Sequence, residues 1–158
     1  MNLKKWKPYL ISAGIALAVG ALSGFLSMSG MEDYMQTVAK PALTPPGWVF
    51  GVIWTLLYTL MGVSAARIWL TPDSIQRSRG LNLYVAQLIV NFFWSLIFFN
   101  AQAFGFALLW LLLLWVLVLL MILQFYKVDK FAAFLQIPYL IWLTFAAYLN
   151  IGVWYLNK

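Results

Sequence analysis

Five apolar runs, each close to the roughly 20 residues that cross the hydrocarbon core of a bilayer, dominate this sequence. No charged side chain lies deep within any of them. Because lipid offers no hydrogen-bond partners, the backbone of each run must pair internally, which favours an α-helix. The runs are Pro8–Met28, Trp48–Leu70, Leu81–Asn100, Phe104–Tyr126 and Ala132–Tyr155. We therefore predict an all-α membrane protein, a bundle of five transmembrane helices that forms a single domain over residues 1–158.

The composition argues against a soluble domain and against most catalytic classes. Only 9% of the residues are charged, against about 25% in a typical soluble domain, which is too few to cover a water-facing surface. The chain has no cysteine and no histidine, so it lacks thiolate ligands and the commonest general base. Its acids are Glu32, Asp33, Asp73 and Asp129. We expect no metal site and no conventional acid–base catalysis.

Lysine and arginine are distributed unequally between the two sides of the predicted bundle. One side carries Lys4, Lys5, Lys7, Arg67, Arg77, Arg79, Lys127 and Lys130, and the other carries Lys40 and Lys158. By the positive-inside rule, the N-terminus is expected inside and the C-terminus outside. The positive charge then belongs to the membrane topology, so we expect the lipid bilayer as a partner and no nucleic acid. The first run is longer than the apolar core of a signal peptide, and we expect it to be retained.

Aromatic, small and amide residues share one face on each of three predicted helices. These faces carry Gly47, Gly51, Trp54, Tyr58 and Ala65 on the second span, Gln87, Asn91, Trp94 and Ser95 on the third, and Tyr139, Trp142, Ala146 and Asn150 on the fifth. An unpaired amide is costly in lipid, so these faces must point into the bundle. Either the amides bond between helices or they line a pocket, and the agreement of three helices favours a pocket. The proline-rich loop, residues 29–47, is expected to cap it, with a stiff connector between the spans as the alternative.

Small residues also recur every four positions on the first span, at Ser12, Ala16, Gly20 and Gly24. Such a stripe lets two helices approach closely. It is interpreted as packing within the chain, with a dimer contact or the wall of a ligand pocket as the alternatives.

Three separated motifs carry a resemblance to a known family. The run KPALTPPGWVFGVIWTLLY, Lys40–Tyr58, is similar to the pattern KPxWxPPxWVFGPVWTxLY, with Leu43 in place of a tryptophan and Val52-Ile53 in place of Pro-Val. The stretches LYVAQLIVNFFWSLIFF, Leu83–Phe99, and PYLIWLTFAAYLN, Pro138–Asn150, follow in the same order. In these motifs the chain resembles the TspO/translocator-protein family, the tryptophan-rich sensory proteins, over nearly its whole length.

The resemblance implies a receptor in a bacterial cell membrane, usually a homodimer. Its helix bundle would bind porphyrins, such as protoporphyrin or haem-type tetrapyrroles, and hydrophobic drug-like molecules such as isoquinoline carboxamides. No cofactor is required, and porphyrin is the ligand or the substrate. The implied ligand-binding residues are Trp54, Tyr58, Gln87, Asn91, Trp94, Trp142, Ala146 and Asn150. We expect Trp54 and Trp142 to stack on the macrocycle and the amides to hold its polar groups.

Two other function classes stay open. The resemblance to some bacterial relatives implies light- and oxygen-dependent breakdown of protoporphyrin, with Trp54 and Trp142 as the catalytic residues. The third class is a transporter of tetrapyrroles or other hydrophobic solutes, although the spans hold no buried charge to couple an ion.

Overall fold

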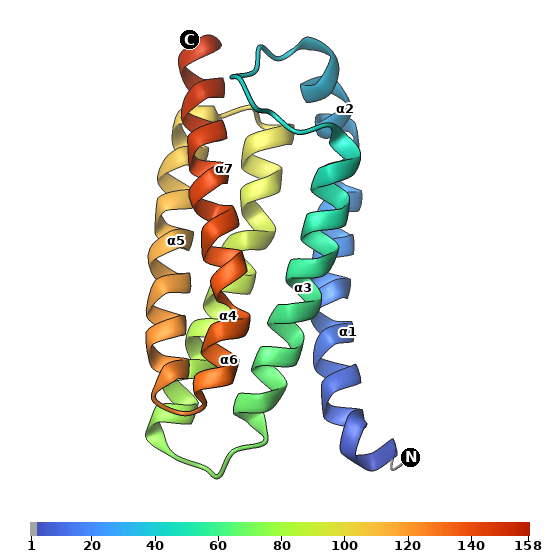
Figure 1. The fold of residues 1–158 in the computed structure, drawn as a ribbon. Helices are drawn as coiled ribbons and strands as arrows, with labels where there is room; N and C mark the ends of the chain where they lie inside the picture. The colour runs from blue at the N-terminus through green and yellow to red at the C-terminus, as the bar shows by residue number, and fades with distance from the viewer. Residues whose placement is uncertain (1–2) are drawn as a thin grey trace.

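The computed structural model describes residues 3–158, and within this range it contains helices and no β-strand (Figure 1). The helices are α1 (Leu3–Leu26), α2 (Met28–Thr37), α3 (Gly47–Trp69), α4 (Ile75–Ser95), the π-helical turn η1 (Leu96–Asn100), α5 (Phe104–Tyr126), α6 (Lys130–Leu135) and α7 (Ile137–Leu156). Among the described residues, five helical segments are long and apolar enough to cross a membrane. The predicted fold class is therefore confirmed. Residues 1–2 of the predicted domain lie outside the described range.

Two spans begin earlier than the apolar runs predict. Helix α1 begins at Leu3 and continues through Pro8. Helix α4 begins at Ile75, six positions before the predicted start, because the Ser74 hydroxyl caps it by accepting the Arg77 backbone N–H at 3.1 Å. Polar first turns can be helical outside the hydrocarbon core, and hydropathy alone does not detect them.

The fifth span consists of two helices that meet at Gln136. Helix α6 begins where the Asp129 carboxylate accepts the backbone N–H groups of Phe131 and Ala132, at 3.0 and 3.3 Å. Pro138 lies in the first turn of α7, where its missing N–H interrupts no helical bond. The break thus falls just before the proline that the sequence placed near the start of this span.

Residues 29–47, predicted to be a loop, contain most of helix α2. Met31, Tyr34 and Val38 follow at spacings of three and four residues, and the last two are buried. Figure 1 shows α2 at the end of the bundle where the C-terminus lies. This segment is therefore a short amphipathic helix followed by a proline-rich connection.

The spans form a closed ring. Helix α1 packs against α3 and α4, α5 packs against α4 and α7, and α6 closes the ring against α3. We call the end with α2 and the C-terminus the C-terminal end, and the opposite end the N-terminal end (Figure 1). Since α3 meets α6 at the N-terminal end, α3 and α7 are free to lie farther apart at the C-terminal end.

Helices α1 and α3 make the closest contact in the bundle. A Cβ atom on Gly62 would overlap the backbone of Ala13, and one on Gly20 would overlap the Tyr58 ring. Ala16, between them on α1, is fully buried. Ala16 and Gly20 therefore pack within the chain, as interpreted, whereas Gly24 has open space around it and follows the alternative of a pocket wall. The contact fixes where α3 presents its aromatic face.

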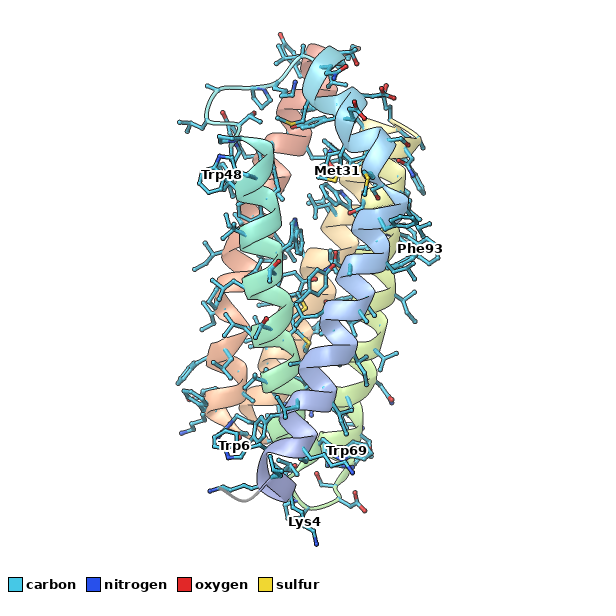
Figure 2. The ribbon with its side chains drawn as sticks, turned by 90° about the vertical axis from the view of Figure 1, so that its right-hand side faces the viewer. Lys4, Trp6, Met31, Trp48, Trp69 and Phe93 are labelled. Atoms are coloured by element: carbon cyan, nitrogen blue, oxygen red, sulfur yellow. The ribbon has the colours of Figure 1, made fainter. Side chains whose placement is uncertain are left out.

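Large aromatic residues mark both ends of the spans. Trp48 lies near the C-terminal end, and Trp6 and Trp69 lie near the N-terminal end (Figure 2). All three are more than a third exposed, as expected for side chains at the boundary between hydrocarbon and headgroups.

Candidate ligand-binding site

A cavity of about 360 Å³ lies inside the C-terminal half of the bundle, within the range of roughly 300–1,000 Å³ that ligand pockets occupy. It is lined by Leu17, Gly20, Ala21, Ser23, Gly24, Met31, Tyr34, Phe50, Gly51, Trp54, Thr55, Tyr58, Trp94, Ser95, Phe98, Phe99, Trp142, Ala146, Leu149 and Asn150. None of these lining residues is charged. Ala21, Gly51 and Thr55 are also exposed on the surface, so the cavity reaches the lipid-facing side between α1 and α3.

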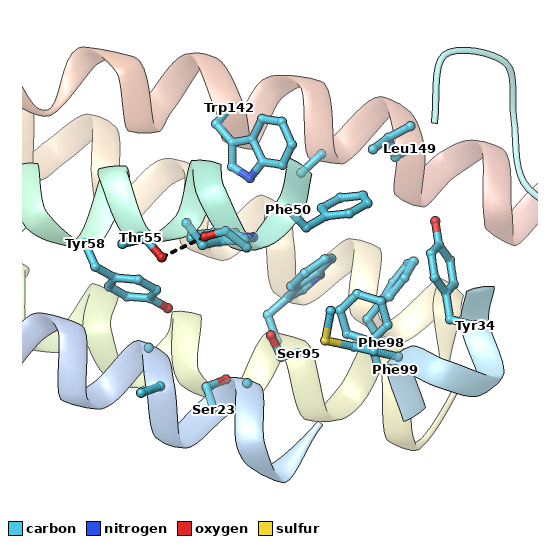
Figure 3. A pocket seen from close by; sticks show the side chains of 18 of the residues that line it. Ser23, Tyr34, Phe50, Thr55, Tyr58, Ser95, Phe98, Phe99, Trp142 and Leu149 are labelled. Atoms are coloured by element: carbon cyan, nitrogen blue, oxygen red, sulfur yellow. Dashed lines mark hydrogen bonds between the residues drawn. The ribbon is translucent and has the colours of Figure 1, made fainter. Parts of the chain in front are cut away.

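Helices α3 and α7 supply an aromatic wall (Figure 3). The rings of Trp54 and Trp142 stand perpendicular, at 89° with centroids 6.3 Å apart. Tyr58 continues the wall at 5.6 Å from Trp54, and Phe50 packs edge-on against Trp142 at 5.8 Å. The Trp142 indole Nε1 is buried and has no hydrogen-bond partner within the described chain. The wall therefore offers flat apolar surfaces and one donor that the protein itself does not use.

The end of α4 supplies a second aromatic group. The π-helical turn η1 follows Trp94, and its wider turn changes the direction of the side chains that follow. Phe98 stacks on Trp94 at 4.9 Å and 22°, and Phe99 lies beside both rings. Trp94 Nε1 donates to Asn150 Oδ1 at 3.3 Å, and Asn150 Nδ2 donates to the Phe104 carbonyl at 2.8 Å. The polar groups of Trp94 and Asn150 thus tie α4, α5 and α7 together behind the cavity.

The other two predicted amides lie deeper in the bundle, toward the N-terminal end. Asn91 Nδ2 donates to the Tyr139 hydroxyl, which in turn donates to Gln87 Oε1, both at 2.8 Å. Gln87 Nε2 completes the chain with a long contact of 3.9 Å to the Met61 sulfur. All are buried. Gln87 and Asn91 bond between helices, whereas the other six predicted residues line the cavity.

Helix α2 covers the cavity at the C-terminal end with Met31 and Tyr34. The Tyr34 ring meets Phe98 and Phe99 at 5.5 and 5.2 Å. Burial raises the pKa of the Tyr34 hydroxyl to about 12, so it is neutral at pH 7. The Lys40 ammonium lies 5.0 Å from the centre of the same ring and donates to the Val38 carbonyl at 2.7 Å. Within the predicted capping segment, residues 29–47, the residues that line the cavity thus lie on α2, and none of the prolines lines it.

The proline-rich residues instead hold the cap to α7. Asn157 exchanges two hydrogen bonds with the backbone of Ala39, at 3.1 and 2.8 Å, and the Tyr148 hydroxyl donates to the Ala42 carbonyl at 2.8 Å. Gly152 leaves room for the Pro41 ring, which a Cβ atom there would overlap. Four contacts from α7 therefore fix the connection between α2 and α3.

Several lining residues were not expected from the sequence. Phe50, Phe98 and Phe99 read as ordinary apolar residues of a membrane span, and Met31 and Tyr34 lie in the segment predicted to be a loop. The helical spacing of Met31, Tyr34 and Val38 is a signal that could have shown that this segment forms a helix with one buried face.

Comparison with known proteins gives relatives that match nearly the whole chain. Residues 12–156 match the TspO/MBR family. The chain is 36% identical to the tryptophan-rich protein TspO of Chlorobaculum tepidum, over 91% of this chain and 92% of that protein. It is 35% identical to protein CrtK of Rhodobacter capsulatus, over 99% and 95% of the two chains. It is also 35% identical to the human translocator protein, over 93% and 90%. With its five apolar spans, this chain is an integral membrane protein that belongs to the TspO/MBR family.

Proposed function

We propose that this protein is a membrane receptor that binds porphyrins and other flat hydrophobic molecules in the cavity between α1, α3, α4 and α7. The observation that carries the proposal is the uncharged aromatic wall in which Trp54 and Trp142 stand perpendicular, 6.3 Å apart. Aromatic faces stack on a planar macrocycle, and perpendicular rings offer it both a face and an edge. Membership of the family supports a membrane receptor or sensory role, and one relative is named a tryptophan-rich sensory protein.

The polar groups around the cavity favour a ligand with few, localised acceptors. The unused Trp142 N–H supports a hydrogen bond to a ligand oxygen or nitrogen. Lys40 puts a positive charge beside Tyr34 at the C-terminal end, which suits an acid group at one edge of the ligand. The surface opening at Ala21, Gly51 and Thr55 gives a hydrophobic molecule a route from the bilayer.

Two glycines on α1 provide a matched test. Gly24 lines the cavity, Gly14 does not, and a Cβ atom on either meets no atom within 4 Å. Gly24→Leu should fill part of the cavity without straining the fold and weaken binding of metal-free protoporphyrin by tenfold or more. Gly14→Leu should leave binding unchanged. Equal affinities for both variants and the wild type would place the ligand elsewhere. The measurement is an absorbance titration of protein in lipid nanodiscs.

A second candidate function is light- and oxygen-dependent degradation of the bound porphyrin. The observation that favours it is that two oxidisable indoles, Trp54 and Trp142, form the wall against which the ligand would lie. Illuminating the complex and identifying the products distinguishes the two functions. One defined tetrapyrrole product that is lost in Trp54→Phe or Trp142→Phe supports an enzyme. Bleaching that survives both changes supports a receptor.

We also propose that the protein lies in a bacterial cell membrane with its N-terminus inside, and that it forms a homodimer. The orientation is supported by the eight lysines and arginines at the N-terminal end, against two at the other.

A further inference from the structure

A second cavity, of about 590 Å³, lies at the N-terminal end of the bundle between α1, α3 and α4. It is lined by Lys4, Lys7, Pro8, Ile11, Ser12, Ile15, Ala65, Ala66, Trp69, Leu81, Tyr84, Val85 and Leu88. It shares no lining residue with the cavity at the C-terminal end. The function proposed above makes no use of it.

The walls of this cavity are apolar and partly face the bilayer. Ile11 and Ile15 on α1 are 51% and 56% exposed, and Val85 on α4 is 54% exposed. Exposed apolar residues on both sides of the α1–α4 seam indicate that the cavity opens sideways into lipid. A hydrocarbon chain can therefore enter it without crossing water.

One end of the cavity is positively charged and lies at headgroup depth. Lys4, Lys7 and Trp69 line the cavity, and Figure 2 shows Lys4, Trp6 and Trp69 at the same end of the bundle. The charge of the cavity mouth therefore complements an anionic group.

Two hydroxyl-bearing side chains are among the residues that line the cavity. Ser12 lines the cavity from α1 and Tyr84 lines it from α4. Tyr84 is 7% exposed, and its hydroxyl has no hydrogen-bond partner within residues 3–158. The hydroxyl is closed off from the cavity, so Tyr84 contributes its ring to the apolar wall.

We propose that this cavity binds one anionic phospholipid of the leaflet at the N-terminal end. Its phosphate lies against Lys4 and Lys7, and one acyl chain fills the seam between α1 and α4. A small anion alone does not account for apolar walls of this extent. A second copy of the chain is disfavoured as the occupant, because it would place its own positive charges beside Lys4 and Lys7 at the mouth of the cavity.

Native mass spectrometry of the full chain tests the proposal, with phosphatidylglycerol and phosphatidylcholine of the same acyl chains as probes. We expect one phosphatidylglycerol to be retained about 30-fold better than phosphatidylcholine, the effect of two lysines near an anionic headgroup. Lys4→Gln with Lys7→Gln should remove this preference. The matched control, Lys127→Gln with Lys130→Gln, removes two charges from the same end on the α5–α6 turn and should keep it.

A cavity-filling variant tests the apolar half. Val85→Trp keeps both lysines and should displace the lipid, whereas Lys127→Gln with Lys130→Gln should not. If the two lysine double variants lost the preference for phosphatidylglycerol equally, the preference would come from the general surface charge, and the proposal would be overturned. Displacement by millimolar inorganic phosphate, or retention of a short-chain phosphatidylglycerol as strongly as the long-chain lipid, would also overturn it. Protoporphyrin can also be added as a competitor. If it displaced the lipid from the wild-type protein but not from the Gly24→Leu variant, the lipid would belong to the cavity at the C-terminal end, and the proposal would be overturned.

Discussion

Trp142 is predicted to serve the ligand and not the fold, and Trp142→Phe separates the two roles. The substitution keeps an aromatic ring in the cavity wall and removes an N–H that has no partner within the described residues. No protein hydrogen bond is broken and a ring remains in place, so the free energy of unfolding should fall by less than the roughly 3–5 kcal/mol that truncating a buried tryptophan to alanine costs. A lost hydrogen bond to ligand costs about 0.5–1.5 kcal/mol, so protoporphyrin affinity should fall roughly two- to tenfold.

Trp94→Phe is the matched variant, because Trp94 lines the same cavity but its N–H is used. Removing that N–H leaves Asn150 Oδ1, now bonded at 3.3 Å, as a buried acceptor without its donor. An unsatisfied buried group costs about 1–3 kcal/mol. We therefore expect Trp94→Phe to lower the melting temperature more than Trp142→Phe does.

The assay combines an absorbance titration with protoporphyrin and thermal unfolding followed by circular dichroism, on both variants in the same lipid nanodiscs. The reasoning would be refuted if Trp142→Phe lost as much stability as Trp94→Phe while its affinity stayed at the wild-type value. The Trp142 N–H would then support the bundle and have no ligand to bind.

Three further predictions concern packing, topology and the cap. Gly62→Ala should destabilise the bundle by about 1–3 kcal/mol in thermal unfolding, because the added methyl overlaps α1, whereas Gly14→Ala, with open space around it, should not. Cysteines placed at the exposed Glu32 and Asp73 should label from opposite faces of the membrane, and labelling from one face would exclude an odd number of spans between them. Because burial raises the Tyr34 pKa from 10.0 to about 12, docking of α2 should hold below pH 10 and weaken as pH rises toward 12. Hydrogen exchange of α2 measures this, and Tyr34→Phe should remove that pH dependence.

Helical periodicity predicted which face of each span points inward, but it did not predict depth along the bundle. Gln87 and Asn91 share a face of α4 with Trp94, yet they precede it by seven and three residues. At about 1.5 Å per residue, this puts them roughly 10 and 4.5 Å farther toward the N-terminal end. There they meet Tyr139 and not the cavity. The vertical position of one helix against another depends on connections and packing that a single sequence does not reveal.

The helical structure of the predicted cap was missed for a related reason. The segment around Tyr34 is short and mixed in polarity, so hydropathy grouped it with the proline-rich residues that follow. Its helix is stabilised by contacts from Phe98 and Phe99, which are distant in sequence. The π-helical turn that presents those two rings has no sequence signature of its own. By contrast, Trp54, Tyr58, Trp142 and Ala146 could be predicted, because helices α3 and α7 extend regularly through the membrane.

A structure of the protein with bound metal-free protoporphyrin tests the central claim most directly. The account predicts the macrocycle beneath α2, with its plane in contact with Trp54 and Trp142 and an acceptor within hydrogen-bond distance of Trp142 Nε1. A macrocycle bound at the N-terminal cavity, or on the outer surface of the bundle with the aromatic wall unoccupied, would contradict it.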